Sequence, residues 1–240
     1  MNAEEIPQAF SRTALVAGEE MLERLASTRI TVFGIGGVGS WCVEALARTG
    51  IGHITIVDPD VVVSSNINRQ LPALHSTVGQ PKVEVVGRRI HDINPLAEVV
   101  AIQDKYTPSN ATQFNLERQD FVIDAIDSLA DKADLILRCT NPLTAPGLGF
   151  YSSMGAARKS DPSKISTAEF WKVEGCPLAR ALRTRFRRSD NFPKRKFLCV
   201  YSPETLPHRM VGDSGVNGTF AHATAIFGLT LASMVVRELY

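Results

Sequence analysis

A short apolar stretch that runs directly into a cluster of glycines constrains the fold of this chain more than any other feature. Residues 29–33 (RITVF) read as a buried strand, and the glycines that follow are Gly34, Gly36, Gly37 and Gly39. Their spacing supplies one glycine for a tight turn, one for close approach of the backbone to phosphate, and one for packing of a helix on the strand. We therefore expect a nucleotide at the end of this strand.

A helix is expected directly after the glycines. One face carries apolar residues at helical spacing, namely Val38, Trp41, Cys42, Ala45 and Leu46, and Gly50 is placed to end the helix. Unpaired N–H groups and the positive end of the dipole make its N-terminus an anion site. Residues 53–57 predict a second strand, and Asp58 at its end is placed to bind a ribose. To this point, a nicotinamide or flavin enzyme fits equally well.

The segment after the second strand adds phosphate-directed groups. Asn66, Arg69 and Gln70 lie at what should be the ligand edge of a doubly wound sheet, and Lys82 opens the next predicted helix. Arg69 offers a planar fork of donors that suits phosphate oxygens. Two cations and a helix N-terminus at one crevice favour a triphosphate such as ATP over a nicotinamide dinucleotide. The alternative interpretation of this segment is a loop whose Asn and Ser residues simply form turns.

The rest of the chain continues an alternation of strands and helices. We predict strands at 98–102, 120–124 and 148–151 and a helix at 129–139, with Asp124 in a structural role and Asp127 placed to hold Mg²⁺. The alternation predicts an α/β fold, a Rossmann-like, doubly wound, mostly parallel sheet with helices on both faces and a C-terminal extension. The expected parts are an N-terminal helical arm (1–28), a nucleotide-binding core (29–151) and a substrate-facing part of the same domain (152–240).

Composition narrows the cellular setting. The four cysteines among 240 residues form no CxxC pair, which favours a reduced, cytoplasmic protein without a zinc ribbon. Residues 1–10 lack the apolar core of a signal peptide. Residues 221–236 are too short and too interrupted for a membrane span, so membrane contact is not expected and the final helix, 220–239, is read as buried. Residues 6–25 predict a helical lead-in with Ser11 as N-cap and an interruption at Gly18.

A positive block stands out in a chain whose formal net charge is only +1. Residues 177–188 predict an amphipathic helix, and the block comprises Arg180, Arg183, Arg187, Arg188, Lys194, Arg195 and Lys196. Such a block is typical of a surface for a polyanion, and rings at Phe186, Phe192 and Phe197 are compatible with stacking on unpaired RNA bases. A solvated helix face followed by a loop is the alternative interpretation.

These motifs together resemble a known family. The runs 34–40 (GIGGVGS), 66–70 (NINRQ) and 125–128 (AIDS), with Asp58 and Lys82, are similar to the adenylating fold of ubiquitin-activating enzymes and bacterial sulfur-carrier activators, the HesA/MoeB/ThiF family. Further runs resemble the bacterial tRNA threonylcarbamoyladenosine dehydratases: 10–13 (FSRT), 44–50 (EALARTG), 66–74 (NINRQLPAL), 78–82 (VGQPK) and 152–157 (SSMGAA). The resemblance covers nearly the whole chain.

The resemblance implies ATP-dependent closure of the threonylcarbamoyl side chain on the adenosine beside the tRNA anticodon. ATP would convert the side-chain carboxylate into an acyl-adenylate, from which the carbamoyl group displaces AMP. By analogy, Asp58 holds the ribose, Arg69 and Lys82 neutralise phosphate charge, and Asp127 positions Mg²⁺. Arg12 would reach the γ-phosphate in a neighbouring subunit, which implies a homodimer.

Two other functions stay open at the level of sequence. One is an adenylating activator of a small ubiquitin-like sulfur-carrier protein, and the other is an NAD enzyme or a nucleotide-binding scaffold. A sulfur-acceptor or cysteine-desulfurase system is a further candidate partner. Cys176, expected near a helix N-terminus, is the best candidate thioester former, although the resemblance does not require one.

Overall fold

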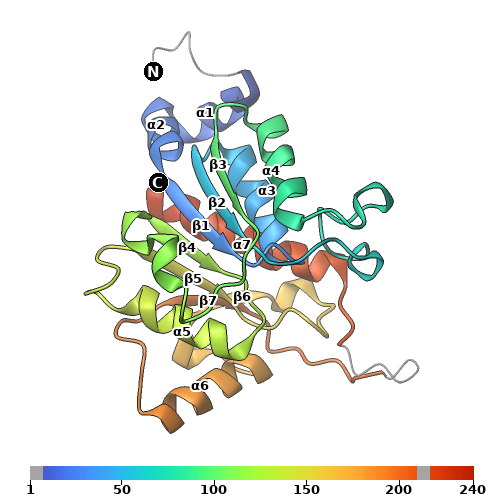
Figure 1. Cartoon of the computed structure of the whole chain (residues 1–240), viewed down its shortest axis with the longest axis vertical. Helices are drawn as coiled ribbons and strands as arrows, with labels where there is room; N and C mark the ends of the chain where they lie inside the picture. The colour runs from blue at the N-terminus through green and yellow to red at the C-terminus, as the bar shows by residue number, and fades with distance from the viewer. Residues whose placement is uncertain (1–7, 210–216) are drawn as a thin grey trace.

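The computed structural model describes residues 8–209 and 217–240, and this part of the chain is built on one seven-stranded sheet (Figure 1). The strands are β1 (Arg29–Phe33), β2 (His53–Val57), β3 (Glu98–Ile102), β4 (Phe121–Asp124), β5 (Gly149–Ser153), β6 (Ser166–Glu169) and β7 (Leu198–Tyr201). Their order is β3-β2-β1-β4-β5-β7-β6, and all neighbours are parallel except β6, which runs antiparallel to β7 at one edge. The predicted mostly parallel sheet is confirmed.

Helices cover both faces of the sheet, as the alternation predicts. They are α1 (Ser11–Ala17), α2 (Glu19–Ser27), α3 (Gly39–Thr49), α4 (Lys82–Ile93), α5 (Leu129–Thr140), α6 (Pro177–Ser189) and α7 (Ala221–Leu239). Apolar residues of α2, α3, α4 and α7 form one core with one face of the sheet. Those of α5 and α6 form a second core on the opposite face. The sheet is therefore the middle of three layers.

The N-terminal lead-in departs from the prediction at its start. Phe10, and not Ser11, occupies the N-cap position of α1, while the Ser11 hydroxyl donates to the carbonyl oxygen of Gln8 at 2.8 Å. The expectation that Ser11 caps this helix is wrong. The interruption at Gly18 is confirmed, because this residue separates α1 from α2 at φ +82°, a conformation that glycine adopts readily. Residues 6 and 7 of the predicted lead-in lie outside the described residues.

The last helix is buried against the helix that follows the glycines. A Cβ atom added at Gly228 of α7 would lie 2.3 Å from the carbonyl oxygen of Val38 and 2.8 Å from the amide nitrogen of Cys42. The backbones of α3 and α7 therefore touch at this point. Within residues 8–209 and 217–240, no helix is both long and apolar enough to cross a bilayer. The interpretation of residues 220–239 as a buried helix is confirmed, with α7 beginning at Ala221.

This contact generates a stability prediction. We expect Gly228→Ala to lower the free energy of unfolding by about 1–3 kcal/mol or more, because the backbone of α3 cannot move aside as a side chain could. Gly87→Ala is the matched control inside α4, since its Cβ would meet only side chains at 3.8 Å and beyond. That control should gain up to about 1 kcal/mol from helix propensity. Urea unfolding of both variants measures the difference, and equal effects would contradict the proposed packing.

Candidate active site

A cavity of about 860 Å³ opens outside the carboxyl ends of β1, β2 and β4. The chain runs from β1 toward β3 in one direction and from β4 toward β7 in the other, so the cavity lies where the strand order reverses. Doubly wound sheets bind their ligands at this point. The walls come from segments far apart in sequence, at 33–38, 57–70, 104–106, 125–131 and 153–157, with Lys82, Leu178, Thr219 and Thr224.

The glycine turn forms one wall of the cavity. Gly34 has φ +87°, and a Cβ there would lie 2.6 Å from the carbonyl oxygen of Ala125. A Cβ at Gly39 would lie 1.8 Å from the carbonyl oxygen of Gly34, so α3 packs directly on the turn. The predicted tight turn and helix-on-strand contact are both confirmed. Gly36 and Gly37 line the cavity beside the first turn of α3.

Asp58 is fixed at the end of β2 by backbone groups. One carboxylate oxygen accepts from the Ile35 amide at 2.6 Å and the other from the Asp60 amide at 2.9 Å. Burial raises the pKa of the Asp58 carboxyl above its ordinary value, although the nearby Lys82 ammonium opposes this effect. Asp58 thus joins the glycine turn to the second strand at the position expected for a ribose ligand.

Lys82 enters the same cavity from the first residue of α4, with its side chain 4% exposed. Its ammonium lies 2.7 Å from Asp60 and 3.8 Å from Asp58. Asp60 was not among the predicted site residues. Its position two residues after Asp58, at the same strand end, could have predicted that it lies in the site. The lysine is therefore held in place by carboxylates at the cavity wall.

Arg69 and Gln70 bring polar groups from the segment after β2. One terminal nitrogen of Arg69 donates to the carbonyl oxygen of Ser65 at 2.9 Å and to the side-chain oxygen of Asn68 at 2.8 Å. Gln70 is buried, and its side-chain oxygen has no hydrogen-bond partner within the described ranges. An unpaired buried acceptor in a cavity wall is a natural partner for a ligand hydroxyl or amine. Asn66 holds this segment by accepting from the Val63 amide.

Asp127 lies on the turn after β4, exposed and lining the cavity. No cluster of three or more His, Cys, Asp or Glu side chains in the described part of the chain could hold a metal by itself. Mg²⁺ does not need such a cluster, because it is commonly held by one or two carboxylates together with substrate phosphates and water. The donor set around Asp127 therefore fits a magnesium–nucleotide complex rather than a permanent metal centre.

A buried ion pair fixes this turn, and the sequence analysis missed half of it. Lys132 on α5 and Asp124 at the end of β4 are both fully buried, with 2.8 Å between ammonium and carboxylate. The lysine also donates to the carbonyl oxygen of Ile126 at 3.0 Å, and Asp124 accepts from the Ile126 amide and the Ser152 hydroxyl. The structural role expected for Asp124 is confirmed. The backbone beside Asp127 is thus held from two sides.

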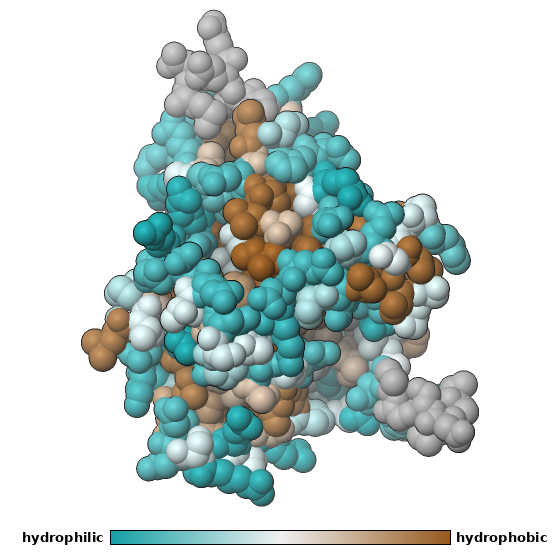
Figure 2. All heavy atoms as spheres, viewed as in Figure 1, coloured by the Kyte–Doolittle hydropathy of each residue, from teal (hydrophilic) through white to brown (hydrophobic). Residues whose placement is uncertain are grey.

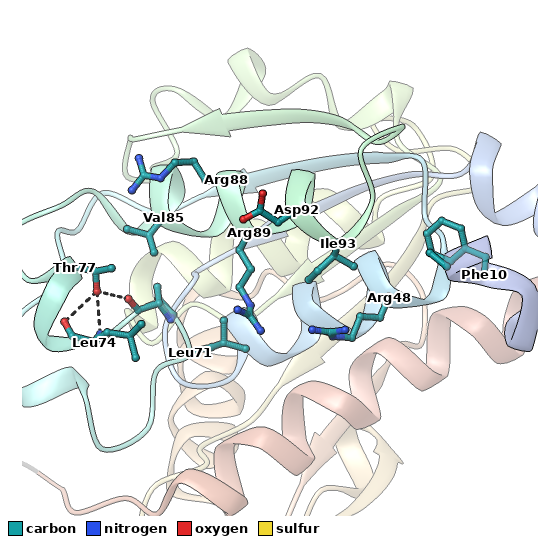
Figure 3. A pocket seen from close by; sticks show the side chains of 12 residues that line it. Phe10, Arg48, Leu71, Leu74, Thr77, Val85, Arg88, Arg89, Asp92 and Ile93 are labelled. Atoms are coloured by element: carbon teal, nitrogen blue, oxygen red, sulfur yellow. Dashed lines mark hydrogen bonds between the residues drawn. The ribbon is translucent and has the colours of Figure 1, made fainter. Parts of the chain in front are cut away.

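A second cavity, of about 600 Å³, lies between α3, α4 and the segment 71–77 (Figure 3). Its arginines already have carboxylate partners. Arg48 and Arg89 both donate to the Glu44 carboxylate at 2.6–2.8 Å, and Arg88 lies 3.8 Å from Glu84. Burial opposes the charge on Glu44, but the hydrogen bonds from Arg89 and Arg48 hold the pKa of its carboxyl below its ordinary value. This cavity is therefore a poor candidate for nucleotide phosphates, and the cavity at the strand ends is the better one.

The remaining predicted site residues lie away from the nucleotide cavity. Arg12 is exposed on α1, near the opposite end of the sheet (Figure 1). The positive block falls on α6 and the segment after it. Within it, Arg183 donates to the carbonyl oxygens of Phe170 and Val173 at 3.1 and 2.9 Å, while Arg195 donates to those of Cys139 and Leu148. These two arginines tie loops together.

The aromatic residues of the block mostly belong to the core. Phe186 and Phe197 are 1% and 5% exposed, so the idea that they stack on RNA bases is wrong. The helical period places an aromatic residue on a face, but it does not say whether that face is covered. Phe192 is exposed and lies beside Trp171, over whose ring Arg187 also sits. Of the aromatic residues in and beside the block that the structure describes, Phe192 and Trp171 present exposed surface next to the cations.

The fold and the site together define a class of ATP-binding α/β proteins. In this class a glycine turn, a helix N-terminus and two cations lie around the nucleotide site. A family model described as the ThiF family matches residues 10–239. The chain belongs to the ThiF family, and within it to the group of proteins named tRNA threonylcarbamoyladenosine dehydratase.

The similarity to that group extends over most of this chain and most of each relative. The tRNA threonylcarbamoyladenosine dehydratase of Bacillus subtilis is 45% identical over 82% of this chain and 75% of its own length. The Escherichia coli protein of the same name is 38% identical over 97% of this chain and 93% of its own. The crystal structure of the Escherichia coli dehydratase in complex with ATP matches with a TM-score of 0.86, covering 97% of this chain and 93% of that one.

The buried ion pair beneath Asp127 yields a second stability prediction. Lys132→Met should cost about 3–5 kcal/mol of unfolding free energy, because it leaves the Asp124 charge buried without its counterion. Lys164→Met is the control, since it breaks an ion pair with Asp161 in which the lysine is 51% and the aspartate 35% exposed. A surface pair of this kind contributes little to stability. Chemical unfolding distinguishes the two, and a loss below 1 kcal/mol for Lys132→Met would refute the assigned role.

Proposed function

We propose that this protein catalyses the ATP-dependent cyclisation of N6-threonylcarbamoyladenosine next to the tRNA anticodon, a net dehydration driven by adenylation of the side-chain carboxylate. The observation that carries the proposal is the cavity itself, which is lined by Asp58, Arg69 and Lys82 and by the glycine turn that leads into α3. Full-length similarity to dehydratases, one of them crystallised with ATP, supports it.

The chemistry follows from the poor reactivity of a free carboxylate. A carboxylate oxygen of the substrate attacks the α-phosphorus of ATP, and the bond to pyrophosphate breaks. The resulting acyl-adenylate has a good leaving group, so the neighbouring carbamoyl group of the same side chain attacks the acyl carbon and AMP departs with the former carboxylate oxygen. The nucleoside thereby loses the elements of water. The substrate supplies both reacting groups, so the protein needs no nucleophile of its own.

In this reaction the chain's own residues act by charge and position. Lys82 and Arg69 stabilise the negative charge that develops on the phosphates, together with the N–H groups at the start of α3. Asp58, pinned by backbone amides, is placed to accept from the ribose hydroxyls. The unpaired side-chain oxygen of Gln70 would satisfy a further donor of the nucleotide, and Asn66 keeps the segment in place.

Asp127 would hold Mg²⁺ together with phosphate oxygens. The metal would add positive charge near the phosphates and help to orient them. The support on this chain is the exposed carboxylate at the cavity wall and the rigid turn beneath it, which Lys132 and Asp124 stabilise.

Activation of a small sulfur-carrier protein is the alternative function. Relatives of that kind match less of the chain: the sulfur carrier protein adenylyltransferase of Thermus thermophilus is 36% identical over 46% of it. All four cysteines are free and buried, and burial raises the pKa of the Cys42 and Cys199 thiols. Buried thiols are poor nucleophiles. These observations favour the tRNA substrate over a carrier protein, and they do not favour a sulfur-transfer partner. Free cysteines also agree with the cytoplasmic location that we propose.

The proposal includes a homodimer in which Arg12 acts in the neighbouring subunit. Arg12 does not line the cavity of its own chain. Exposed apolar side chains lie near Arg12 in the sequence, Leu15 and Val16 on α1. Others lie in the projecting segment after β2, namely Val78 and Leu74, which lines the cavity of Figure 3. Figure 2 shows apolar surface gathered over that segment. Exposed apolar surface of this kind suits contact with a second copy of the chain.

The central test measures chemistry on the purified protein. With ATP, Mg²⁺ and tRNA carrying threonylcarbamoyladenosine, we expect the nucleoside to lose one water while AMP forms in equal amount. Arg69→Ala and Asp127→Ala should each lower kcat/KM at least about 100-fold, as the loss of a transition-state charge contact does. Arg118→Ala is the control, because this arginine is exposed and lines none of the three cavities described for this structure. Unchanged nucleoside mass with ATP still bound would support carrier activation instead.

A complementation experiment tests the in-trans role of Arg12. Arg12→Ala and Arg69→Ala proteins should each be inactive, but each chain supplies what the other lacks. Mixed and re-equilibrated in equal amounts, they should regain activity at about one quarter of the sites, because half the dimers are mixed and each has one complete site. AMP release before and after mixing is the measurement. An active Arg12→Ala protein, or no recovery in dimers confirmed to be mixed, would contradict the role.

A further inference from the structure

A groove of about 850 Å³ runs between α5 and α6, outside the nucleotide cavity. The two spaces adjoin, because Asp131 lines both, while Ser128 and Leu178 line the cavity and their neighbours Leu129 and Pro177 line the groove. The nucleotide cavity and the groove are therefore neighbours, so a polymer with its reacting nucleotide in the cavity would have adjacent nucleotides near the groove.

The α6 wall of the groove carries cations without counterions. Arg180, Arg185 and Arg188 are exposed, and none has a carboxylate within ion-pair distance among the residues that the structure describes. At a rise of 1.5 Å per residue, the first and last of them are about 12 Å apart along the helix. They form a row of planar donors that suits successive phosphate groups.

The α5 wall carries acids, but their charges are already balanced. Asp131 pairs with Lys105 at 2.9 Å, and Asp134 pairs with Arg138 at 3.2 Å and accepts from the Tyr106 hydroxyl at 2.7 Å. Burial opposes ionisation of Asp131, yet its pair with Lys105 holds the pKa of this carboxyl below the ordinary value. Carboxylates that are already paired repel a phosphate only weakly, so the unpaired arginines make the charge of the groove positive.

The groove also has apolar lining. Leu129, Ala133, Leu137 and Ala181 line it, together with Phe186, whose side chain is 1% exposed. Apolar surface flanked by cations accommodates the faces of unpaired bases while the arginines hold the backbone. This combination favours single-stranded RNA over a double helix, whose bases are stacked inside.

We propose that the α5–α6 groove binds the single-stranded RNA that flanks the modified adenosine, with Arg180, Arg185 and Arg188 contacting its phosphates. This inference rests on the proposed function, since it needs a tRNA loop whose reacting nucleoside lies in the adjoining cavity. It also divides the positive block by role. Arg183 and Arg195 stabilise loops through backbone carbonyls, and Lys194 and Lys196 are exposed cations outside the groove.

The test compares two double variants that remove the same charge. The Arg180→Gln/Arg188→Gln variant removes two arginines from the groove wall. The Lys194→Gln/Lys196→Gln variant removes the same number of positive charges outside the groove and is the matched control. Binding of threonylcarbamoyladenosine-containing tRNA is measured against salt concentration, together with ATP binding and thermal unfolding. We expect the groove variant to bind tRNA at least about tenfold more weakly and to lose about 1.4 from the salt slope, as two single-strand phosphate contacts predict. The control should change much less, and ATP binding should be unchanged.

A third variant separates shape from charge. Ala181→Leu narrows the groove without altering its charge, so it should weaken tRNA binding while leaving the salt slope unchanged. Equal losses of tRNA affinity in both double variants would mean diffuse attraction to positive charge and would contradict the proposed RNA binding in the groove. Unaltered tRNA binding by the groove variant would contradict it as well. If the unaltered protein bound ATP but no tRNA, the proposed function itself would fall, and the groove assignment with it.

Discussion

The close approach of the glycine turn to the end of β4 is the constraint on which the site depends. The turn leaves no room for a Cβ at Gly39, and Gly34 touches the backbone of Ala125. The Ala125 amide also donates to the carbonyl oxygen of Phe33 at 2.8 Å, so the two turns are held to each other. Consequently the N-terminus of α3 and the turn that carries Asp127, the proposed phosphate and Mg²⁺ positions, belong to one rigid frame.

Two ion pairs support the site, and they differ in how firmly their partners are held. Asp58 keeps two backbone hydrogen bonds whatever Lys82 does, whereas Asp60 is 62% exposed and is readily solvated. Under the proposed function, a phosphate would replace Asp60 as the partner of the buried Lys82 ammonium, and the exposed Asp60 carboxylate would return to water. Asp124 has no such freedom, since both it and Lys132 are fully buried. The site thus combines a fixed pair that maintains the frame with an exchangeable pair that faces the ligand.

Most of this frame was predictable because it is local in sequence. The glycine spacing, Asp58 at a strand end and Lys82 at a helix start each follow from a few neighbouring residues. What sequence could not supply is which long side chains meet distant backbone. Arg183 reads as one more surface cation, yet it binds the carbonyl oxygen of Phe170, 13 residues away. Lys132 shows no periodic signal of a partner, because its partner depends on how α5 packs against β4.

The division of labour between core and C-terminal part follows from the proposed chemistry. If the substrate carries both its electrophile and its nucleophile, the core need only activate the phosphate, which a nucleotide cavity common to many folds can do. Cys176 illustrates this: it occupies the N-cap position of α6, but it is 2% exposed and packs in the core. Selecting the right carboxylate then falls to surfaces outside the cavity. On this chain, α6 and the groove beside it are the surfaces in contact with the cavity's mouth.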